Sequence, residues 1–174
     1  MATHSGFSLI ELLVVIAIIS ISAGMVTFGL KGYQTKSRVE AQVRQIATDI
    51  NDLRIRALTT KQRHSIVLYP SYYVLKSYST ETYTTNDALV ANGTPIGTNS
   101  AVSFRLKLSY ADIVADTGTA IEINQRGMLA ALPQTIFLAT GASASSASIN
   151  CLTVHTVRVN VGKQNDITKV CDDK

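Results

Sequence analysis

The stretch HSGFSLIELLVVIAIISISAG, residues 4–24, decides how this chain is organised. Between Leu12 and Leu30 there are 19 residues without a charged side chain. An α-helix needs about 20 apolar residues to cross the hydrocarbon core of a bilayer. The stretch therefore predicts a membrane helix near the start of the chain. One carboxylate, Glu11, comes just before the uncharged run and has to be explained.

Two ordinary membrane segments compete for this stretch, a cleaved signal peptide and a permanent single-span anchor. A signal peptide has a positive n-region and small residues before the cut. Here only the amino terminus and His4 precede Glu11, and Ser22 and Gly24 make a poor cleavage site. Glu11 suits neither segment, because an acid in hydrocarbon costs about 2.5–3.5 kcal/mol on insertion scales. Glu11 therefore needs either an oppositely charged partner or a local structural role.

A local role is available from the spacing of Ser8 and Glu11, which is that of a capping box. In such a box the Ser8 side chain accepts from the backbone N–H of Glu11, while the Glu11 side chain reaches back to the start of the helix. On residue types alone, a capping role and pairing with an opposite charge explain an acid at the start of a helix equally well.

The wider string GFSLIELLVVIAII, residues 6–19, resembles the N-terminus of type IV pilins and pseudopilins. It has a short leader ending in Gly6, an aromatic Phe7, an acid four residues later and an unbroken apolar run. The resemblance implies that prepilin peptidase cuts after Gly6 and methylates the amine of Phe7. It also implies that Glu11 neutralises the Phe7 amine of a neighbouring subunit during assembly, since a buried charge becomes tolerable when it is paired.

The same resemblance implies partners and a location. The partners are other pilin or pseudopilin subunits, prepilin peptidase, the inner-membrane assembly platform and membrane lipid. The chain is expected to span the bacterial inner membrane once, with its head on the periplasmic or extracellular side, before assembly into a pilus or pseudopilus. Two features depart from the family pattern. The leader MATHSG lacks Lys and Arg, and the apolar run has Gly24, Gly29 and Gly32 in place of a proline.

Residues 32–62 are predicted to continue the helix as an amphipathic one. Apolar residues recur at alternating steps of four and three, which is the spacing of one helix face: Val39, Val43, Ile46, Ile50, Leu53 and Ala57. We expect this face to pack on the globular head, with a partner helix on another face as the alternative. The charged residues along the helix, Arg54 among them, are expected to form a solvated surface.

The remainder, residues 63–174, is predicted to be a β-rich head. Six segments are rich in β-branched and aromatic residues: HSIVLYP (64–70), YYVLKSYS (72–79), VSFRLKL (102–108), TAIEIN (119–124), QTIFLAT (134–140) and CLTVHTVRVNVG (151–162). In the last, the alternation continues from Val154 to Val159. Residues 80–101 and 141–148 are predicted to be exposed loops. The order of helix and strands resembles the GspH/FimT group of minor pilins and pseudopilins.

These patterns predict an α+β fold in which a long N-terminal helix packs on a mostly antiparallel sheet. The expected segments are a leader at 1–6, a membrane-embedded helix at 7–31, an amphipathic continuation at 32–62 and the head at 63–174. The expected function is that of a structural assembly subunit of a type IV pilus or a type II secretion pseudopilus. The sequence does not distinguish between these two machines and a competence pilus.

Charge is distributed unevenly along the chain. Residues 31–63 hold eight Lys or Arg against three acids, whereas eight face eight from residue 64 onward. A basic segment after an apolar run suits anionic lipid or acidic partners. Some members of the FimT group bind DNA through a C-terminal basic motif, and the nearest stretch here, VGKQNDITK (161–169), lacks its paired arginines. DNA binding is therefore the alternative function, with Arg158, Lys163 and Lys169 as candidate residues.

The two cysteines, Cys151 and Cys171, are expected to form one disulfide if the head lies on an oxidising side of the membrane, and otherwise to be two buried thiols. No familiar catalytic motif is present, and His64 and His155 are isolated. We therefore expect no enzyme activity, no cofactor and no metal site. A secreted hydrolase with a cleaved signal peptide is the rival class, and it would begin near Met25.

Overall fold

The computed structural model describes most of the chain, which forms two compact units, Met1–Thr35 and Lys36–Lys174. The described residues are 8–80, 82–83, 85–108, 113, 118–129, 134–139, 147–165 and 170–173, and for 25–31, 139 and 173 only the backbone is described. Helix α1, Leu9–Thr60, contributes to both units. All the described strands belong to the second unit, which is called the head here.

In the head, α1 buries one face along its length. The six residues of the predicted stripe, Val39, Val43, Ile46, Ile50, Leu53 and Ala57, are at most 1% exposed. Their period places them on one side of the helix, so the predicted amphipathic helix is confirmed. The helix ends at Thr60, because Lys61 has a left-handed backbone with φ of 54° and cannot continue it.

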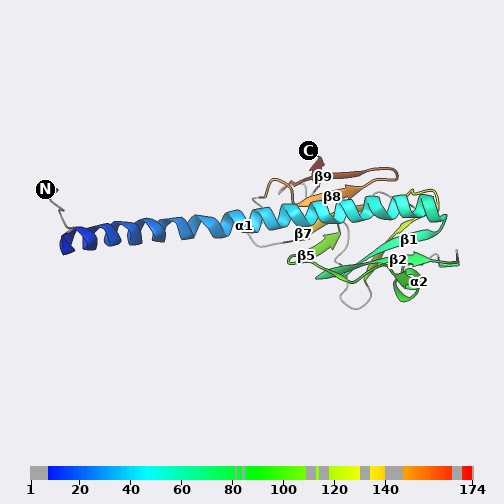
Figure 1. The fold of residues 1–174 in the computed structure, drawn as a ribbon. Coiled ribbons are helices and arrows are strands. Elements are labelled where there is room, and N and C mark those ends of the chain that lie inside the picture. Colours follow the sequence, from blue (N-terminus) through cyan, green and yellow to red (C-terminus); the bar gives the residue numbers. More distant parts are fainter. Residues whose placement is uncertain are drawn as a thin grey trace. The chain divides into compact units, whose positions relative to one another are not determined.

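The head contains two antiparallel sheets (Figure 1). The first has the order β3-β2-β1-β6, with β4 also paired to β2, and its strands are β1 (Arg63–Leu68), β2 (Tyr72–Tyr78), β3 (Thr94–Pro95), β4 (Ser100–Ala101) and β6 (Thr119–Ile123). The second has the order β10-β9-β8-β7-β5, with β5 (Arg105–Leu108), β7 (Gln134–Ala139), β8 (Cys151–Val154), β9 (Val159–Gln164) and β10 (Cys171–Asp173). The predicted α+β class, a long helix on antiparallel sheets, is confirmed.

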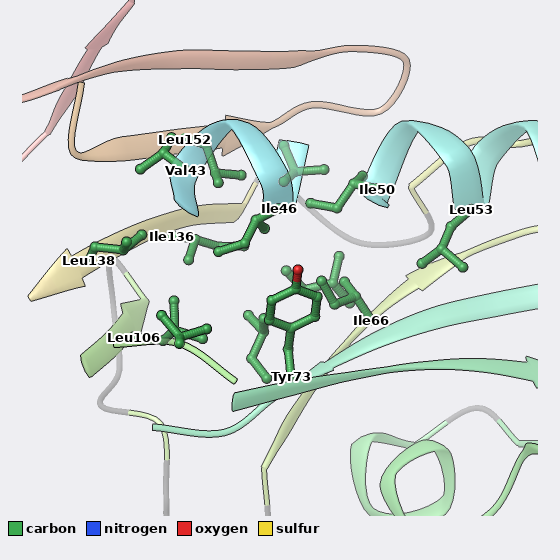
Figure 2. Close-up of a cluster of buried hydrophobic side chains, with 14 of the residues drawn as sticks. Val43, Ile46, Ile50, Leu53, Ile66, Tyr73, Leu106, Ile136, Leu138 and Leu152 are labelled. Carbon is green, nitrogen blue, oxygen red and sulfur yellow. The ribbon is translucent and has the colours of Figure 1, made fainter. Parts of the chain in front are cut away.

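One hydrophobic core joins the helix to both sheets (Figure 2). The buried face of α1 meets Ile66 and Tyr73 from the first sheet and Leu106, Ile136 and Leu152 from the second. These residues belong to a single cluster. The head is therefore organised around the helix, whose buried face shares one core with both sheets.

A polar contact inside this core ties the helix to the first sheet. The hydroxyl of Tyr73 on β2 donates to Oδ2 of Asp49 on α1 at 2.5 Å. Burial, together with this hydrogen bond, raises the pKa of the Tyr73 phenol above its usual value. A phenol whose pKa is raised on folding stabilises the head below pH 10, and that contribution is lost as the pH rises further.

We expect Tyr73→Phe to lower the free energy of unfolding by about 1.5 kcal/mol, because hydrogen bonds to charged groups contribute about 1.5–3 kcal/mol. Urea unfolding of the full-length protein in neutral detergent measures this as a lower midpoint with an unchanged slope. Tyr33→Phe is the matched control, because Tyr33 is 71% exposed. An equal shift in both variants would mean that the Tyr73–Asp49 contact contributes nothing specific.

The expectation of a loop at 80–101 is wrong in part: the described residues there are mostly exposed, as expected, but they are not all loop. This segment contains helix α2, Asn86–Ala91, and the short strands β3 and β4. The Thr85 hydroxyl accepts from the backbone N–H of Ala88 and caps the start of α2, while the Lys76 ammonium donates to the carbonyls of Val90 and Asn92 at its end. Leu89 is the buried residue of α2. In the other expected loop, residues 141–146 lie outside the described residues, and Ala147 is buried in the core.

The expectation of a continuous strand through 154–159 is also wrong. A turn at His155–Arg158 separates β8 from β9 and is closed by a bond from the backbone N–H of His155 to the carbonyl of Arg158, at 2.8 Å. Arg54 on α1 donates through Nη2 to the carbonyl of His155 at 2.5 Å. The backbone N–H of Leu129 donates to the carbonyl of Thr156. Contacts from distant segments therefore hold the turn.

Arg54 does not belong to the solvated surface that the sequence predicts. It is 7% exposed, and this burial lowers the pKa of its guanidinium. Its Nη2 donates to turn carbonyls, whereas its buried Nε has no hydrogen-bond partner among the residues that the structure describes. Arg54 therefore connects the helix to the β8–β9 turn from inside the head.

Candidate functional site

The first unit presents an apolar helix surface. Ten Leu, Ile and Val side chains are between 46% and 80% exposed: Leu9, Ile10, Leu12, Leu13, Val14, Val15, Ile16, Ile18, Ile19 and Ile21. They follow one another too closely to lie on one face of a helix. A helix that is apolar all round is normally buried in lipid or among other helices. Within the described residues, no helical stretch meets the length and hydropathy needed to cross a membrane.

The few polar side chains of this segment differ in how their hydrogen-bonding groups are paired. The hydroxyls of Ser20 and Ser22 donate to the carbonyls of Ile16 and Ile18, at 2.7 and 2.8 Å. Such bonds within the helix let a serine lie in apolar surroundings. Glu11 is exposed in the first helical turn. Its carboxylate is therefore the one charged group of the described segment Leu9–Gly24 that an apolar environment would leave without compensation.

The helix start uses backbone groups. The backbone N–H groups of Glu11 and Leu12 donate to the carbonyl of Ser8, at 3.1 and 3.3 Å. Among the described residues, no bond joins the side chains of the predicted capping box to these backbone groups. The negative charge of Glu11 still lies at the positive end of the helix dipole, where a carboxylate is favoured.

Comparison with known families identifies this N-terminal segment. Residues 1–27 match the family model described as the prokaryotic N-terminal methylation motif. The chain carries a type IV prepilin-like signal. Searches among curated proteins and among solved structures found no match. The matched residues contain Gly6, Phe7 and Glu11 and end before the head, so the match bears on the N-terminal signal and not on the head.

The prepilin-like signal supports a coarse role for the chain. Proteins with this motif are type IV pilin-like substrates of prepilin peptidase and assemble with other pilins. Gly6 and Phe7, the predicted processing residues, lie outside the described residues. Glu11 is described, and its exposed position in the first turn leaves its carboxylate accessible to another molecule.

In the head, Cys151 and Cys171 form a disulfide. It joins β8 to β10 across β9, and Phe137 of β7 packs with the two cysteines. Gly162 of β9 lies in this crossing, where an added Cβ would come within 2.1 Å of the carbonyl oxygen of Asp172. A residue without a side chain is therefore required at Gly162 for β10 to approach.

The candidate DNA-binding residues do not form a cluster in the described part of the head. Arg158 is exposed in the β8–β9 turn, and Lys163 lies five residues later on β9, about 16 Å along an extended strand. Lys163 is paired in register with Asp172 of β10, so an acidic residue lies opposite it in the sheet. Lys169 lies outside the described residues.

Sequence reasoning assigned no role to a polar hollow at one end of β6. It is lined by Arg63, Asn124, Gln125 and Arg126. The residues after β6 carry a turn signal, Asn124 followed by Gly127, but nothing in the sequence places Arg63 beside them. The structure does so, because β1 and β6 are neighbours in the first sheet.

Proposed function

We propose that this protein is a minor pilin or pseudopilin, a structural assembly subunit of a type IV pilus or a type II secretion pseudopilus. Prepilin peptidase removes residues 1–6 and methylates the amine of Phe7. The helix from residue 7 to about 31 then holds the subunit in the inner membrane, with the head on the periplasmic or extracellular side. The observation that carries the proposal is the methylation motif at residues 1–27.

The exposed apolar helix supports polymerisation as its mode of action. Leu9–Gly24 has large apolar side chains on all sides and one uncompensated carboxylate. Lipid covers such a surface in the free subunit, and the helices of neighbouring subunits cover it in a fibre. The Phe7 amine of one subunit compensates the Glu11 carboxylate of another, because a buried charge pair costs far less than either charge alone.

A structural role also accounts for the head. Its charged groups at the core, Arg54 and Asp49, are used to join the helix to the sheets and the β8–β9 turn. This use of charged groups supports a role in assembly. The partners are other pilin subunits and the inner-membrane assembly platform.

The mature N-terminus tests this proposal. We expect protein purified from its own membranes to begin at N-methylated Phe7, as measured by intact mass and N-terminal sequencing. In cells without prepilin peptidase the chain should keep residues 1–6 and lack the methyl group. Gly6→Val should block the cut, because the bulky residue stands at the scissile bond, whereas Thr3→Val is the matched control that leaves it intact. A start near Met25 would indicate a secretory signal peptide and would overturn the proposal.

A further inference from the structure

The hollow beside β6 has the size of a site for a small ion or group. Its volume is about 210 Å³, whereas pockets for drug-sized ligands usually measure roughly 300–1,000 Å³. Arg63, the first residue of β1, lies on one side, and residues Asn124–Arg126 of the turn after β6 complete the lining. Both charged side chains among these described lining residues are arginines.

Arg63 is held in place by two contacts. Its Nε lies 2.8 Å from Oε1 of Glu122, with both side chains at most 16% exposed. Its Nη1 donates to the carbonyl of Tyr83 at 2.5 Å. A guanidinium has five N–H donors in one plane, so these two contacts fix the plane and leave further donors on the same group.

The turn that forms the other wall is also fixed. Oδ1 of Asn124 accepts from the backbone N–H groups of Arg126 and Met128, at 2.9 and 3.0 Å. Gly127 has φ of +71° and lies so close to α1 that an added Cβ would be 3.0 Å from Cγ of Leu58. Because its amide oxygen is occupied, the Asn124 side chain has only its NH₂ donors to offer a ligand. Arg126 is exposed at the rim.

We propose that this hollow binds the oxyanion of a phosphate group, held by the Arg63 guanidinium, the Asn124 amide and the Arg126 guanidinium. Glu122 neutralises one arginine, so the charge on the described lining remains positive through Arg126. Planar guanidinium groups match the geometry of phosphate and carboxylate oxygens. Donors on two walls favour phosphate, because its oxygens point in several directions while a carboxylate has two in one plane. This inference does not depend on the proposed function.

Phosphate-dependent stabilisation of the full-length protein in neutral detergent tests the site. A ligand that binds only the folded state raises the unfolding temperature as its concentration increases. We expect inorganic phosphate to do this when sodium chloride keeps the ionic strength constant. Arg126→Gln should weaken the apparent affinity about tenfold, as expected for the loss of a charged hydrogen bond. Arg105→Gln, which removes an exposed arginine from β5, should leave it unchanged.

A second titration, with glycerol 3-phosphate, identifies the source of the phosphate group. Binding of both ligands would show that the hollow accepts phosphate carried on a larger molecule, and binding of inorganic phosphate alone would restrict it to the free ion. Either result supports the site. The proposal is overturned if neither ligand raises the unfolding temperature more than chloride does. It is also overturned if Arg105→Gln weakens phosphate binding as much as Arg126→Gln does, because the effect would then be one of net charge.

Discussion

We expect Glu11→Ala to reduce incorporation of the subunit into fibres at least tenfold while its cleavage after Gly6 continues. Without this carboxylate, the Phe7 amine of a neighbouring subunit would be buried without its partner. Breaking a buried ion pair costs about 3–5 kcal/mol, and each 1.4 kcal/mol is a factor of ten in an equilibrium. The ratio of subunit in the sheared fibre fraction to subunit in the membrane measures the effect.

Glu11→Gln separates the charge from the shape of this side chain. Glutamine keeps the size and a hydrogen-bonding oxygen but has no negative charge, so we expect it to assemble as poorly as alanine. Asp87→Asn, an exposed acid in the first turn of α2, is the control for loss of one carboxylate. Normal incorporation of Glu11→Gln would exclude the pairing of charges, and would return Glu11 to a local role at the helix start.

Loss of the disulfide has the second large expected effect. We expect the double variant Cys151→Ser, Cys171→Ser to lower the free energy of unfolding by about 3 kcal/mol, the chain-entropy value for a loop of this length. The bridge spans 20 residues of sequence and holds a three-residue strand, β10, against the sheet. Urea unfolding of the full-length protein in neutral detergent measures the change.

Reduction provides an independent control for this prediction. A thiol reductant should lower the stability of the unmodified protein by a similar amount and should have no effect on the double variant. Because β10 is short and its described pairing with β9 covers residues 171–173, we expect hydrogen exchange to increase there before it does in β7 and β8. Unchanged stability in both the reduced protein and the double variant would show that the pairing of β10 does not depend on the bridge.

Local sequence patterns predicted the head part of α1 well because its apolar stripe extends over many residues. The stripe from Val39 to Ala57 repeats over five turns, and only a helix places those positions on one face. The prepilin-like motif is similarly local, since Gly6, Phe7 and Glu11 lie within six residues of one another. Such features need no knowledge of the tertiary structure.

Helix α2 was missed because it is short. Its six residues bury only Leu89, which is too little for a periodic pattern. Thr85 before it and Asn92-Gly93 after it are ordinary start and stop signals for a helix. They also occur in loops, and in a polar segment they indicated a loop.

The turn between β8 and β9 and the hollow were missed for a different reason. His155–Arg158 contains no Gly, Pro or Asn, so nothing in the sequence interrupts the alternation. The turn is held by hydrogen bonds from Arg54 and Leu129, which are far from it in the sequence. The hollow likewise joins residue 63 to residues 124–126 through the pairing of β1 with β6. Strand register is a tertiary property and could not be obtained from these patterns.

The placement of covalent and non-covalent contacts in the head also determines how it responds to force. The disulfide connects β8 to β10 within one sheet, whereas α1, which continues into β1 through residues 61–62, packs on both sheets through apolar contacts and through hydrogen bonds such as those of Tyr73 and Arg54. Tension applied along the helix therefore loads contacts that can separate without breaking a covalent bond. We expect a stretched subunit to loosen the packing of its helix on the sheets, while the disulfide keeps β8 and β10 joined and able to receive the helix again.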